Sequence, residues 1–327
     1  MNLHGFVTVA AVLSIGSGAV AGRTQLQSTQ TPSLQGHRKH RRGGELRVRC
    51  TLMSMICTLR RQRAGLALVM VVCLVAVVSL RAFQSVVPPK PGQPGKDVVW
   101  VPTPAELVEK MLDMAGVSPN DFVIDLGSGD GRNVIAAAKR GARALGVEYN
   151  PDLVALSQQR AADAHVSDKA TFVQGDMYAA DVSQATVLAL FLTPEVLDRM
   201  TDKFLAMKPG ARIVLNTFPV TDWEPDATET IAPCKAWCTA LLVIVPARVG
   251  GTWQWGNTQM TLRQDYQFVR GTLGAQPVTG RLRGAHITLK SANTEYSGEV
   301  FADRIEGTAT AEGSQTPWIA VRSQPRP

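Results

Sequence analysis

Three glycines and two aspartates share one short segment, Asp-Leu-Gly-Ser-Gly-Asp-Gly at residues 125–131. Glycines let a backbone turn tightly and approach a ligand closely, because they lack a Cβ atom. A loop that cradles a pyrophosphate has the spacing Gly-x-Gly-x-x-Gly and places the phosphates on the N-terminus of the following helix. Here the spacing is Gly-x-Gly-x-Gly, and Asp125 and Asp130 would repel a dianionic pyrophosphate. The segment therefore favours a ligand that carries positive charge and no phosphate.

Two further acids follow at intervals that suit a nucleoside. Glu148 ends the next apolar run, where a carboxylate can accept both ribose hydroxyls. Asp176 follows a third apolar run, near the position of an adenine amino group. With the glycine loop, these acids predict a site for S-adenosylmethionine, whose amino-acid and sulfonium portion carries positive charge. Each feature also has a plainer alternative: the loop as an ordinary turn, Glu148 as a solvated acid and Asp176 as a helix cap.

Strands that end at one edge of a sheet must bring these acids together. Short apolar runs alternate with helical patterns from residue 101 onward, and the run at 185–192 holds no charge, as expected for a strand covered on both faces. Thr103, Pro104 and Glu106 predict a capping box at the first helix. The alternation predicts an α/β fold with a doubly wound parallel sheet and ligands at its C-terminal strand ends. The expected strands are 122–126, 144–149, 170–173, 185–192, 211–218 and 237–245, and one expected helix is 194–207.

The composition indicates a folded body that does not bind nucleic acid. Of the 327 residues, 45% are hydrophobic and 19% are charged, which excludes global disorder. The net charge of +7 arises near the N-terminus, where residues 23–64 hold ten Lys and Arg against one acid and Arg81 adds one more. Residues 86–327 then carry a net charge of −3, and a mildly acidic body lacks the basic footprint of a nucleic-acid partner.

An uncharged apolar stretch at residues 64–80 predicts a membrane anchor. Its length is at the short end for a helical span, and three arginines lie just before it while only Arg81 lies just after. This charge bias places the body outside the cytoplasm, on the periplasmic side, in conflict with a cofactor that is made in the cytoplasm. A cleaved signal peptide and a buried soluble helix are the alternatives to a transmembrane segment or signal anchor at 64–81.

The body's only two cysteines, Cys234 and Cys238, are too few for a structural zinc site, so no metal is expected. They form a local disulfide if the body lies in an oxidising compartment and remain free thiols otherwise. From Gly251 onward, short strands separated by glycine turns predict a small antiparallel β module, either a meander or a barrel. The expected organisation is a disordered basic region with a signal-like start at 1–63, the anchor at 64–81, a linker at 82–98, the α/β domain at 99–249, the β-rich module at 250–315 and a tail at 316–327.

Residues 101–225 resemble the class I S-adenosylmethionine-dependent methyltransferases. More narrowly, they are similar to the family of lysine methyltransferases of the mitochondrial ATP synthase c subunit and adenine nucleotide translocase, with its bacterial relatives. The matching segments are Val-Pro-Thr-Pro at 101–104, residues 125–132, residues 134–139, Gly-Val-Glu-Tyr-Asn-Pro at 146–151, and Phe218-Pro219 with Trp223 and Pro225. The resemblance implies a Rossmann-like methyltransferase sheet that binds S-adenosylmethionine through Asp125, Gly127, Ser128, Gly129, Gly131 and Glu148, with Pro102 and Thr103 near the methyl group.

The same resemblance implies methyl transfer to a lysine of a protein acceptor. A sulfonium methyl is already activated, so alignment and exclusion of water are the main requirements and no single catalytic side chain is predicted. Residues 191–194, Phe-Leu-Thr-Pro, are expected to face the acceptor, and they lack the Asn-Pro-Pro-Tyr pattern of enzymes that methylate amides or adenine. The alternatives are a catalytically inactive relative that serves as a binding or assembly protein at the membrane, and an NAD(P)-dependent oxidoreductase, which the glycine spacing disfavours. The oligomeric state is not predicted.

Overall fold

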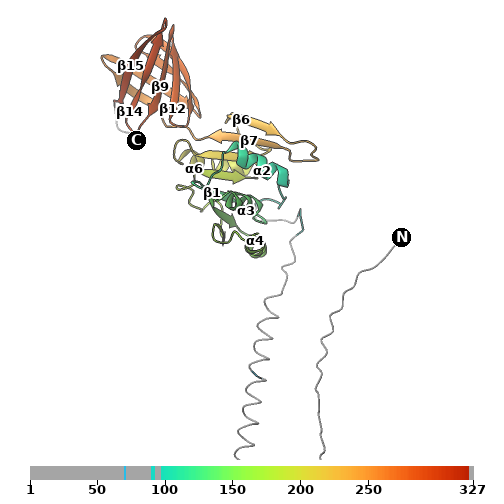
Figure 1. Cartoon of the computed structure of the whole chain (residues 1–327). Helices are drawn as coiled ribbons and strands as arrows, with labels where there is room; N and C mark the ends of the chain where they lie inside the picture. Colours follow the sequence, from blue (N-terminus) through green and yellow to red (C-terminus); the bar gives the residue numbers. More distant parts are fainter. Residues whose placement is uncertain (1–69, 71–89, 93–96, 324–327) are drawn as a thin grey trace, which may run out of the picture. The chain divides into compact units, whose positions relative to one another are not determined.

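A computed structural model describes residue 70, residues 90–92 and residues 97–323 of the chain (Figure 1). The expected N-terminal region at 1–63, nearly all of the anchor at 64–81 and most of the linker at 82–98 lie outside these residues. The described residues from 90 onward belong to the second of two compact units, Gln84–Pro327. Within the described residues, no helix is both long enough and apolar enough to span a bilayer.

A seven-stranded sheet flanked by helices makes up the first part of the described chain (Figure 1). Its strands are β1 (Phe122–Leu126), β2 (Arg143–Glu148), β3 (Ala170–Gln174), β4 (Val187–Leu190), β5 (Arg212–Asn216), β6 (Ala227–Thr230) and β7 (Thr239–Ile244). The helices are α2 (Ala105–Met114), α3 (Arg132–Lys139), α4 (Pro151–Asp163), α5 (Pro194–Arg199) and α6 (Thr201–Leu205). The strand order is β3-β2-β1-β4-β5-β7-β6, in which β7 is antiparallel to both of its neighbours. Strand order reverses between β1 and β4, and ligands bind at such a point in open α/β sheets.

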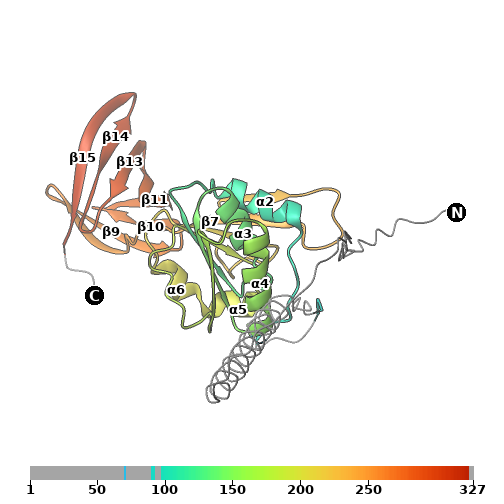
Figure 2. The same ribbon diagram turned by 60° about the horizontal axis from the view of Figure 1, so that its bottom comes forward.

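Consecutive residues of each central strand enter opposite cores. Val123 of β1 packs into the core formed with α2, α3 and α4, whereas Ile124 packs into the core formed with α5 and α6. Val187 and Leu188 of β4 alternate in the same way. The helices accordingly cover both faces of the sheet (Figure 2). This confirms the doubly wound α/β fold and explains why β4 carries no charge.

Two local predictions in this domain are wrong. Thr103 does not cap α2, because Pro104 occupies the N-cap position and the Thr103 hydroxyl instead lies 3.2 Å from Nδ2 of Asn216. Asn216 is buried, so its side-chain amide needs a hydrogen-bond partner within the protein. The start of α2 is exposed, so water can satisfy its backbone amides. The expected helix at 194–207 is broken into α5 and α6, with Met200 between them in a non-helical conformation.

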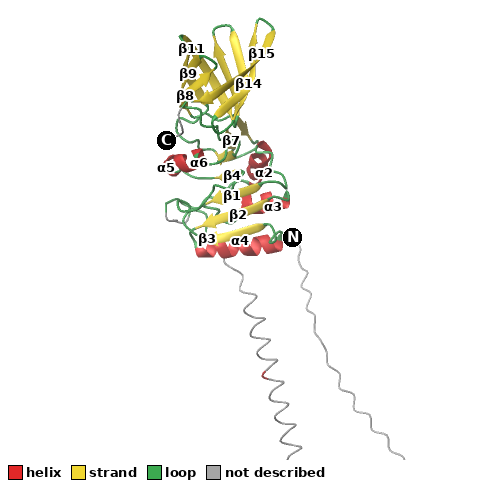
Figure 3. Cartoon of the chain, turned by 90° about the vertical axis from the view of Figure 1, so that its left-hand side faces the viewer, coloured by secondary structure: helices red, strands yellow, loops and turns green. Residues whose placement is uncertain are grey.

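The second part of the chain is a closed barrel of antiparallel strands (Figure 3). Its strands are β8 (Gly251–Trp255), β9 (Thr258–Asp265), β10 (Phe268–Leu273), β11 (Gln276–Arg283), β12 (His286–Ser291), β13 (Thr294–Val300), β14 (Arg304–Ala311) and β15 (Ser314–Arg322). The expectation of a small β module is confirmed in its barrel form. The expected tail is wrong up to Arg322, because β15 continues past residue 315 with Trp318 and Ala320 in the barrel core.

Direct contacts join the barrel to the sheet. Arg281 of β11 pairs with Glu224 at 3.4 Å and with Asp226 at 3.1 Å, next to the start of β6. Tyr266, in the turn after β9, stacks on the buried Trp223 with ring centroids 5.0 Å apart. The Gln267 side chain donates to the Glu224 carbonyl at 2.7 Å. The barrel thus packs against the β5–β6 connection and contributes no residue to the pocket at the C-terminal ends of the parallel strands.

Asp121 ties the start of β1 to β4 and β5. The carboxylate accepts hydrogen bonds from the Ser118 amide at 2.8 Å and the Thr186 hydroxyl at 2.7 Å, and it pairs with Arg212. Burial opposes its ionisation, but the hydrogen bonds from Thr186 and Ser118 and the charge of Arg212 outweigh this and hold the pKa of Asp121 below its usual value. The ionised carboxylate therefore stabilises the folded protein.

We expect Asp121→Ala to lower the free energy of unfolding by about 2–4 kcal/mol, because Arg212 and Thr186 lose a buried partner. Urea denaturation at pH 7 measures this loss. Because the folded pKa is lowered, the stabilisation is present above the unfolded pKa of about 4 and is lost as the pH falls below it. The difference between variant and wild type should therefore shrink on acidification; a constant difference from pH 7 to pH 3 would contradict the assignment.

Candidate functional site

A pocket of about 440 Å³ opens at the C-terminal ends of the parallel strands. Its walls come from the segment before α2 and from the loops that follow β1, β2, β3, β4 and β5. The predicted site residues that line it are Pro102, Thr103, Asp125, Gly127, Ser128, Gly129, Glu148 and Asp176. Gly131, the remaining predicted residue, is not part of the lining. The strand ends thus bring together residues from four separate parts of the sequence, as the alternation of strands and helices predicts.

The glycine loop after β1 needs glycine for different reasons at different positions. Gly129 has φ +55°, and a Cβ atom there would lie 2.4 Å from the indole nitrogen of Trp100, which also lines the pocket. Gly131 has φ +79° and precedes α3, and its Cβ would lie 2.7 Å from the ring of Phe172. At Gly129, a larger residue would therefore clash with a side chain of the pocket wall. Gly131 is constrained by packing behind the loop, which is why it does not reach the pocket.

Glu148 joins the end of β2 to the glycine loop. One carboxylate oxygen accepts a hydrogen bond from the Gly129 amide at 2.8 Å, and the other accepts one from the Asn150 amide at 2.8 Å. The side chain is buried but lines the pocket. A carboxylate has about four lone-pair sites, so each oxygen can also accept a ligand hydroxyl. Glu148 is thus held in place without its acceptor capacity being used up.

Asp125 is a buried acid at the floor of the pocket, with 3% of its surface exposed. Burial raises the pKa of Asp125 to about 8, and the nearby charges of Glu148 and Asp130 add to the rise. A hydrogen bond from the side-chain amide of Asn133 lowers the pKa but does not offset these effects. At neutral pH the protein without a bound cation therefore favours the protonated form of Asp125. A cationic group bound beside Asp125 would favour its ionised form.

This shift predicts that cofactor binding releases a proton. Below a pH of about 8, binding of a cation must ionise Asp125, so affinity should rise by up to about tenfold per pH unit toward that value. Calorimetry in buffers of different ionisation enthalpy measures the release, and Asp125→Asn should abolish it. The raised pKa also makes the empty protein lose stability as the pH rises from about 4 to about 8. Binding heats that do not depend on the buffer would contradict this assignment.

Asp130 has a different role from the one expected of it. It forms salt bridges with Arg132 and Arg160, and its side chain is 2% exposed. Burial opposes its ionisation, but the two arginines outweigh burial and hold the pKa of Asp130 below its usual value. Arg132 also donates to the Thr103 carbonyl, which fixes the segment before α2 against the loop. The charge of Asp130 is therefore neutralised within the protein, and it does not serve a cationic ligand.

Asp176 shapes the turn after β3 and also faces the pocket. One of its carboxylate oxygens accepts a hydrogen bond from the Tyr178 amide at 2.9 Å, and its carbonyl accepts one from Ala179 at 3.1 Å. The side chain is half-buried and belongs to the lining. The predicted ligand contact and the simpler turn-capping role are compatible at this position. Contact with an adenine stays a prediction.

Two buried polar atoms at the pocket lack a partner in the described part of the chain. These are the Ser128 hydroxyl and the Asn133 side-chain carbonyl, and both residues line the cavity. Unsatisfied buried polar groups are uncommon in folded proteins and often mark the place of a ligand. Together with Asp125 and Glu148, they fit a nucleoside that carries a cationic amino-acid tail. The residues present therefore suit S-adenosylmethionine.

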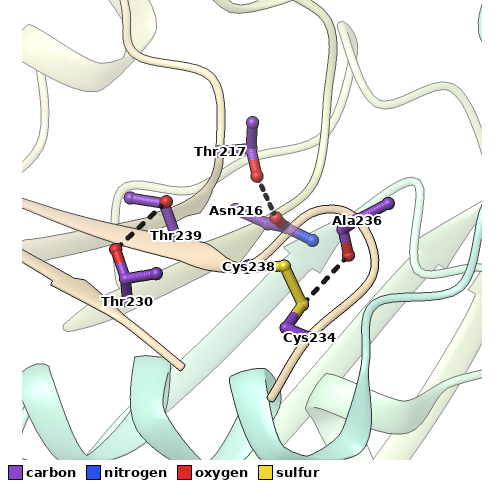
Figure 4. Close-up of a disulfide and its surroundings, with 7 residues drawn as sticks. All are labelled: Asn216, Thr217, Thr230, Cys234, Ala236, Cys238 and Thr239. Atoms are coloured by element: carbon purple, nitrogen blue, oxygen red, sulfur yellow. Dashed lines mark hydrogen bonds between the residues drawn. A yellow bond between two sulfur atoms is a disulfide. The ribbon is translucent and has the colours of Figure 1, made fainter. Parts of the chain in front are cut away.

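The expected acceptor segment also reaches the pocket. Phe191, Leu192 and Thr193 line it, whereas Pro194 does not, and that this segment faces an acceptor stays a prediction. Phe218 and Trp237 lie beside them in the lining, although sequence patterns did not single out Trp237. Trp237 belongs to a loop closed by a disulfide between Cys234 and Cys238, which lies next to the end of β5 (Figure 4). The disulfide alternative is thus the one that the structure contains.

Comparison with known proteins identifies the family of this domain. Residues 125–227 match the profile described as the ANTKMT methyltransferase domain. A protein-lysine N-methyltransferase of Saccharolobus islandicus is 38% identical over 131 residues, which make up 39% of this chain and 81% of that protein. The crystal structure of an RNA methyltransferase from Salinibacter ruber in complex with S-adenosyl-L-homocysteine is 39% identical, with a TM-score of 0.43, over 46% of this chain and 96% of that one.

Two mouse enzymes match over smaller shares of their length. The Mus musculus lysine N-methyltransferase of the ATP synthase c subunit is 38% identical over 130 residues, or 39% of this chain and 52% of that protein. The adenine nucleotide translocase lysine N-methyltransferase of Mus musculus is 37% identical over 142 residues, or 43% of this chain and 62% of that protein. The chain thus spans about half to three-fifths of the length of the mouse proteins.

Proposed function

The chain belongs to the ANTKMT family of S-adenosylmethionine-dependent methyltransferases, and from this premise we propose that it methylates a lysine side chain of a protein by direct in-line transfer. The observation that carries the proposal is the shared cavity. The glycine loop and Glu148 on one side, and Phe191 and Phe218 on the other, line the same pocket of about 440 Å³. A cofactor held by the first group would present its methyl group to an acceptor that enters beside the second.

The protein's own groups supply binding, alignment and desolvation. The cofactor contributes a methyl group on a positively charged sulfur: the acceptor nitrogen forms the new C–N bond as the S–C bond breaks, and the positive charge passes to nitrogen, which then loses a proton to water. Glu148 and the loop at 127–129 would hold the nucleoside, and Pro102 and Thr103 would lie near the methyl group. The lysine ammonium must lose its proton to water before it attacks, because only the neutral amine carries the lone pair that forms the new bond.

Labelled methyl transfer tests this proposal. The full chain is incubated with methyl-labelled S-adenosylmethionine and with membrane and soluble extracts, and the labelled species are separated and hydrolysed to amino acids. The purified c subunit of ATP synthase, named as the target of the mouse relative, serves as one defined acceptor. We expect the label in methylated lysine. Label in RNA or in another amino acid would refute the proposed acceptor, and Gly129→Ala serves as the control without cofactor.

The same assay separates the alternatives. Cofactor binding without transfer to any extract would favour an inactive relative that acts in binding or assembly. Binding of reduced nicotinamide cofactor instead of S-adenosylmethionine would favour an oxidoreductase. The glycine spacing supports the methyltransferase, because a loop that cradles a pyrophosphate has the spacing Gly-x-Gly-x-x-Gly. Arg132, the arginine that lines the pocket beside the loop, is already paired with Asp130 and is not available to bind a pyrophosphate.

We further propose that residues 64–81 anchor the protein in a membrane with its body on the periplasmic side. The arginine bias around the stretch supports this orientation. The disulfide between Cys234 and Cys238 also supports it, because such bonds persist in oxidising compartments. A topology reporter fused after residue 327 tests the proposal. Activity of a cytoplasmic reporter would contradict it and would remove the conflict with a cofactor made in the cytoplasm.

A further inference from the structure

Three aromatic rings from separate elements meet at one end of the pocket. Phe191 follows β4, Phe218 follows β5, and Trp237 lies in the connection between β6 and β7. The ring centroid of Trp237 lies 5.6 Å from that of Phe191 and 5.6 Å from that of Phe218, and the two phenylalanine centroids are 6.3 Å apart. All three side chains line the cavity, and together we call them the aromatic mouth.

Trp237 is held in place by a constrained loop. The disulfide joins Cys234 to Cys238, the residue directly after Trp237, and the Ile231 amide donates to the Cys238 carbonyl at 3.0 Å. Trp237 has φ +60°, in the left-handed region that bulky residues rarely adopt. Trp237 is nevertheless 38% exposed, so burial does not account for the strained backbone. Strain of this kind is often found at functional sites, where the surrounding structure maintains it.

Sheet order places the aromatic mouth at the acceptor end of the pocket. Glu148 ends β2 and Asp176 follows β3, and both strands lie on one side of β1, whereas the phenylalanines follow β4 and β5 on the other side. Thr103, which also lines the pocket, accepts a hydrogen bond at 3.2 Å from Asn216 at the end of β5. The rings therefore lie on the side of β1 away from the two acids that would hold the nucleoside.

Aromatic rings in this arrangement suit a positively charged nitrogen. A cation within about 6 Å of a ring centroid is attracted by the negative face of the ring, and cages of several rings recognise quaternary ammonium groups. The three rings pack together with centroid separations of 5.6–6.3 Å and all line the cavity, so a small cation bound against them can lie within that range of more than one ring. In methyl transfer, positive charge passes from sulfur to the acceptor nitrogen, which is where such a mouth would stabilise it.

We propose that Phe191, Phe218 and Trp237 form a cation-binding mouth for the methylated amine of the acceptor, and that the Cys234–Cys238 disulfide sustains its affinity by fixing Trp237. The proposal rests on the proposed function, because it assigns the charged acceptor nitrogen of that reaction to this end of the pocket. It makes Trp237 a specificity determinant that contacts the acceptor and not the cofactor. It also makes the mouth selective for alkylated ammonium groups over neutral groups of the same shape.

A pair of isosteric probes tests the charge requirement without any acceptor protein. Choline carries a trimethylammonium group, and 3,3-dimethylbutan-1-ol carries a neutral tert-butyl group of the same shape. Each is titrated into the full chain saturated with S-adenosylhomocysteine, and the methyl signal of the probe is followed by NMR. We expect choline to bind about tenfold more tightly or better, with an upfield shift from the ring currents. Equal binding of the two probes, or no binding of choline, would overturn the proposal.

Matched variants test the residues. Trp237→Ala should weaken choline binding about tenfold, whereas Trp237→Phe should retain most of it, because a ring face is kept. The double variant C234S/C238S should weaken it severalfold with every ring intact. Affinity for S-adenosylhomocysteine should stay within about twofold in all three variants, which also reports that they are folded. Unchanged choline affinity in Trp237→Ala, or in the double serine variant, would refute the corresponding half of the proposal.

The outcomes distinguish this proposal from the proposed function. If S-adenosylhomocysteine binds and choline does not, the aromatic mouth fails while the methyltransferase assignment stands. If choline binds selectively and labelled lysine is never found, the mouth stands and the acceptor class fails. With an acceptor in hand, Trp237→Ala should raise the KM for that acceptor about tenfold at unchanged cofactor affinity, and an effect on cofactor affinity alone would contradict the assignment.

Discussion

Gly129→Ala is expected to weaken the binding of S-adenosylmethionine by at least about 100-fold. The new Cβ would lie 2.4 Å from the indole nitrogen of Trp100, and φ of +55° is already unfavourable for alanine. Relief of the clash would push Trp100 into the pocket or move the Gly129 amide away from Glu148. Either change removes groups from the nucleoside side of the cavity. Calorimetric titration with S-adenosylhomocysteine measures the loss.

Gly116→Ala is the matched control for this variant. Gly116 ends the turn after α2 with φ +58°, and a Cβ there meets no atom within 4 Å. Like Gly129→Ala, it should strain the backbone, and its free energy of unfolding should fall by about 1–2 kcal/mol. Its affinity for S-adenosylhomocysteine should not change. Equal affinities of the two variants would show that the close approach of Trp100 to the loop has no part in cofactor binding.

Glu148→Ala is expected to reduce cofactor affinity by about 100- to 1000-fold, because charge-assisted hydrogen bonds to two ribose hydroxyls are lost. The buried amides of Gly129 and Asn150 also lose their acceptor, so the loop itself should loosen. Glu148→Gln keeps the size of the side chain, but its NH2 group is a donor and cannot accept from one of these two amides. Its affinity for the cofactor should therefore lie between that of the wild type and that of Glu148→Ala. Titration with the cofactor and with a 2′-deoxyribose analogue separates the two effects.

The analogue makes this prediction specific. The wild type should bind the 2′-deoxyribose analogue more weakly than the cofactor, whereas Glu148→Ala should bind the two with similar affinity. Glu106→Ala, which removes an exposed acid on α2, is the control for a general effect of charge and should bind as wild type does. Additive losses from the variant and the analogue would mean that Glu148 supports the loop but does not touch the ribose.

The sheet could be predicted because its signals are local. Each strand is a short apolar run, the glycine turn follows β1 directly, and Glu148 and Asp176 stand at strand ends. Parallel strands bring such ends to one edge, so residues far apart in sequence can be grouped from their positions at strand ends alone. The sequence predicted an antiparallel β module but not that the module closes into a barrel. Closure depends on the pairing of β15 with β8, which are far apart in the sequence.

The parts that escaped prediction depend on contacts between side chains. Asp130 is an acid in a ligand-binding motif, yet Arg160, 30 positions later, neutralises it. Thr103 has the residue type of a helix cap, yet a buried amide on β5 takes its hydroxyl. Trp237 lines the pocket from a loop that is closed by a disulfide and in which its backbone is left-handed. Each of these outcomes is decided by tertiary packing, which sequence spacing does not encode.

Titration of the full chain with S-adenosylmethionine, in parallel with reduced nicotinamide cofactor, tests the central claim most directly. We predict saturable one-to-one binding of S-adenosylmethionine that releases a proton at neutral pH, is lost in Gly129→Ala and is kept in Gly116→Ala, with no binding of the nicotinamide cofactor. Absence of binding by the wild-type chain, or equal binding by the two glycine variants, would contradict the account of this pocket.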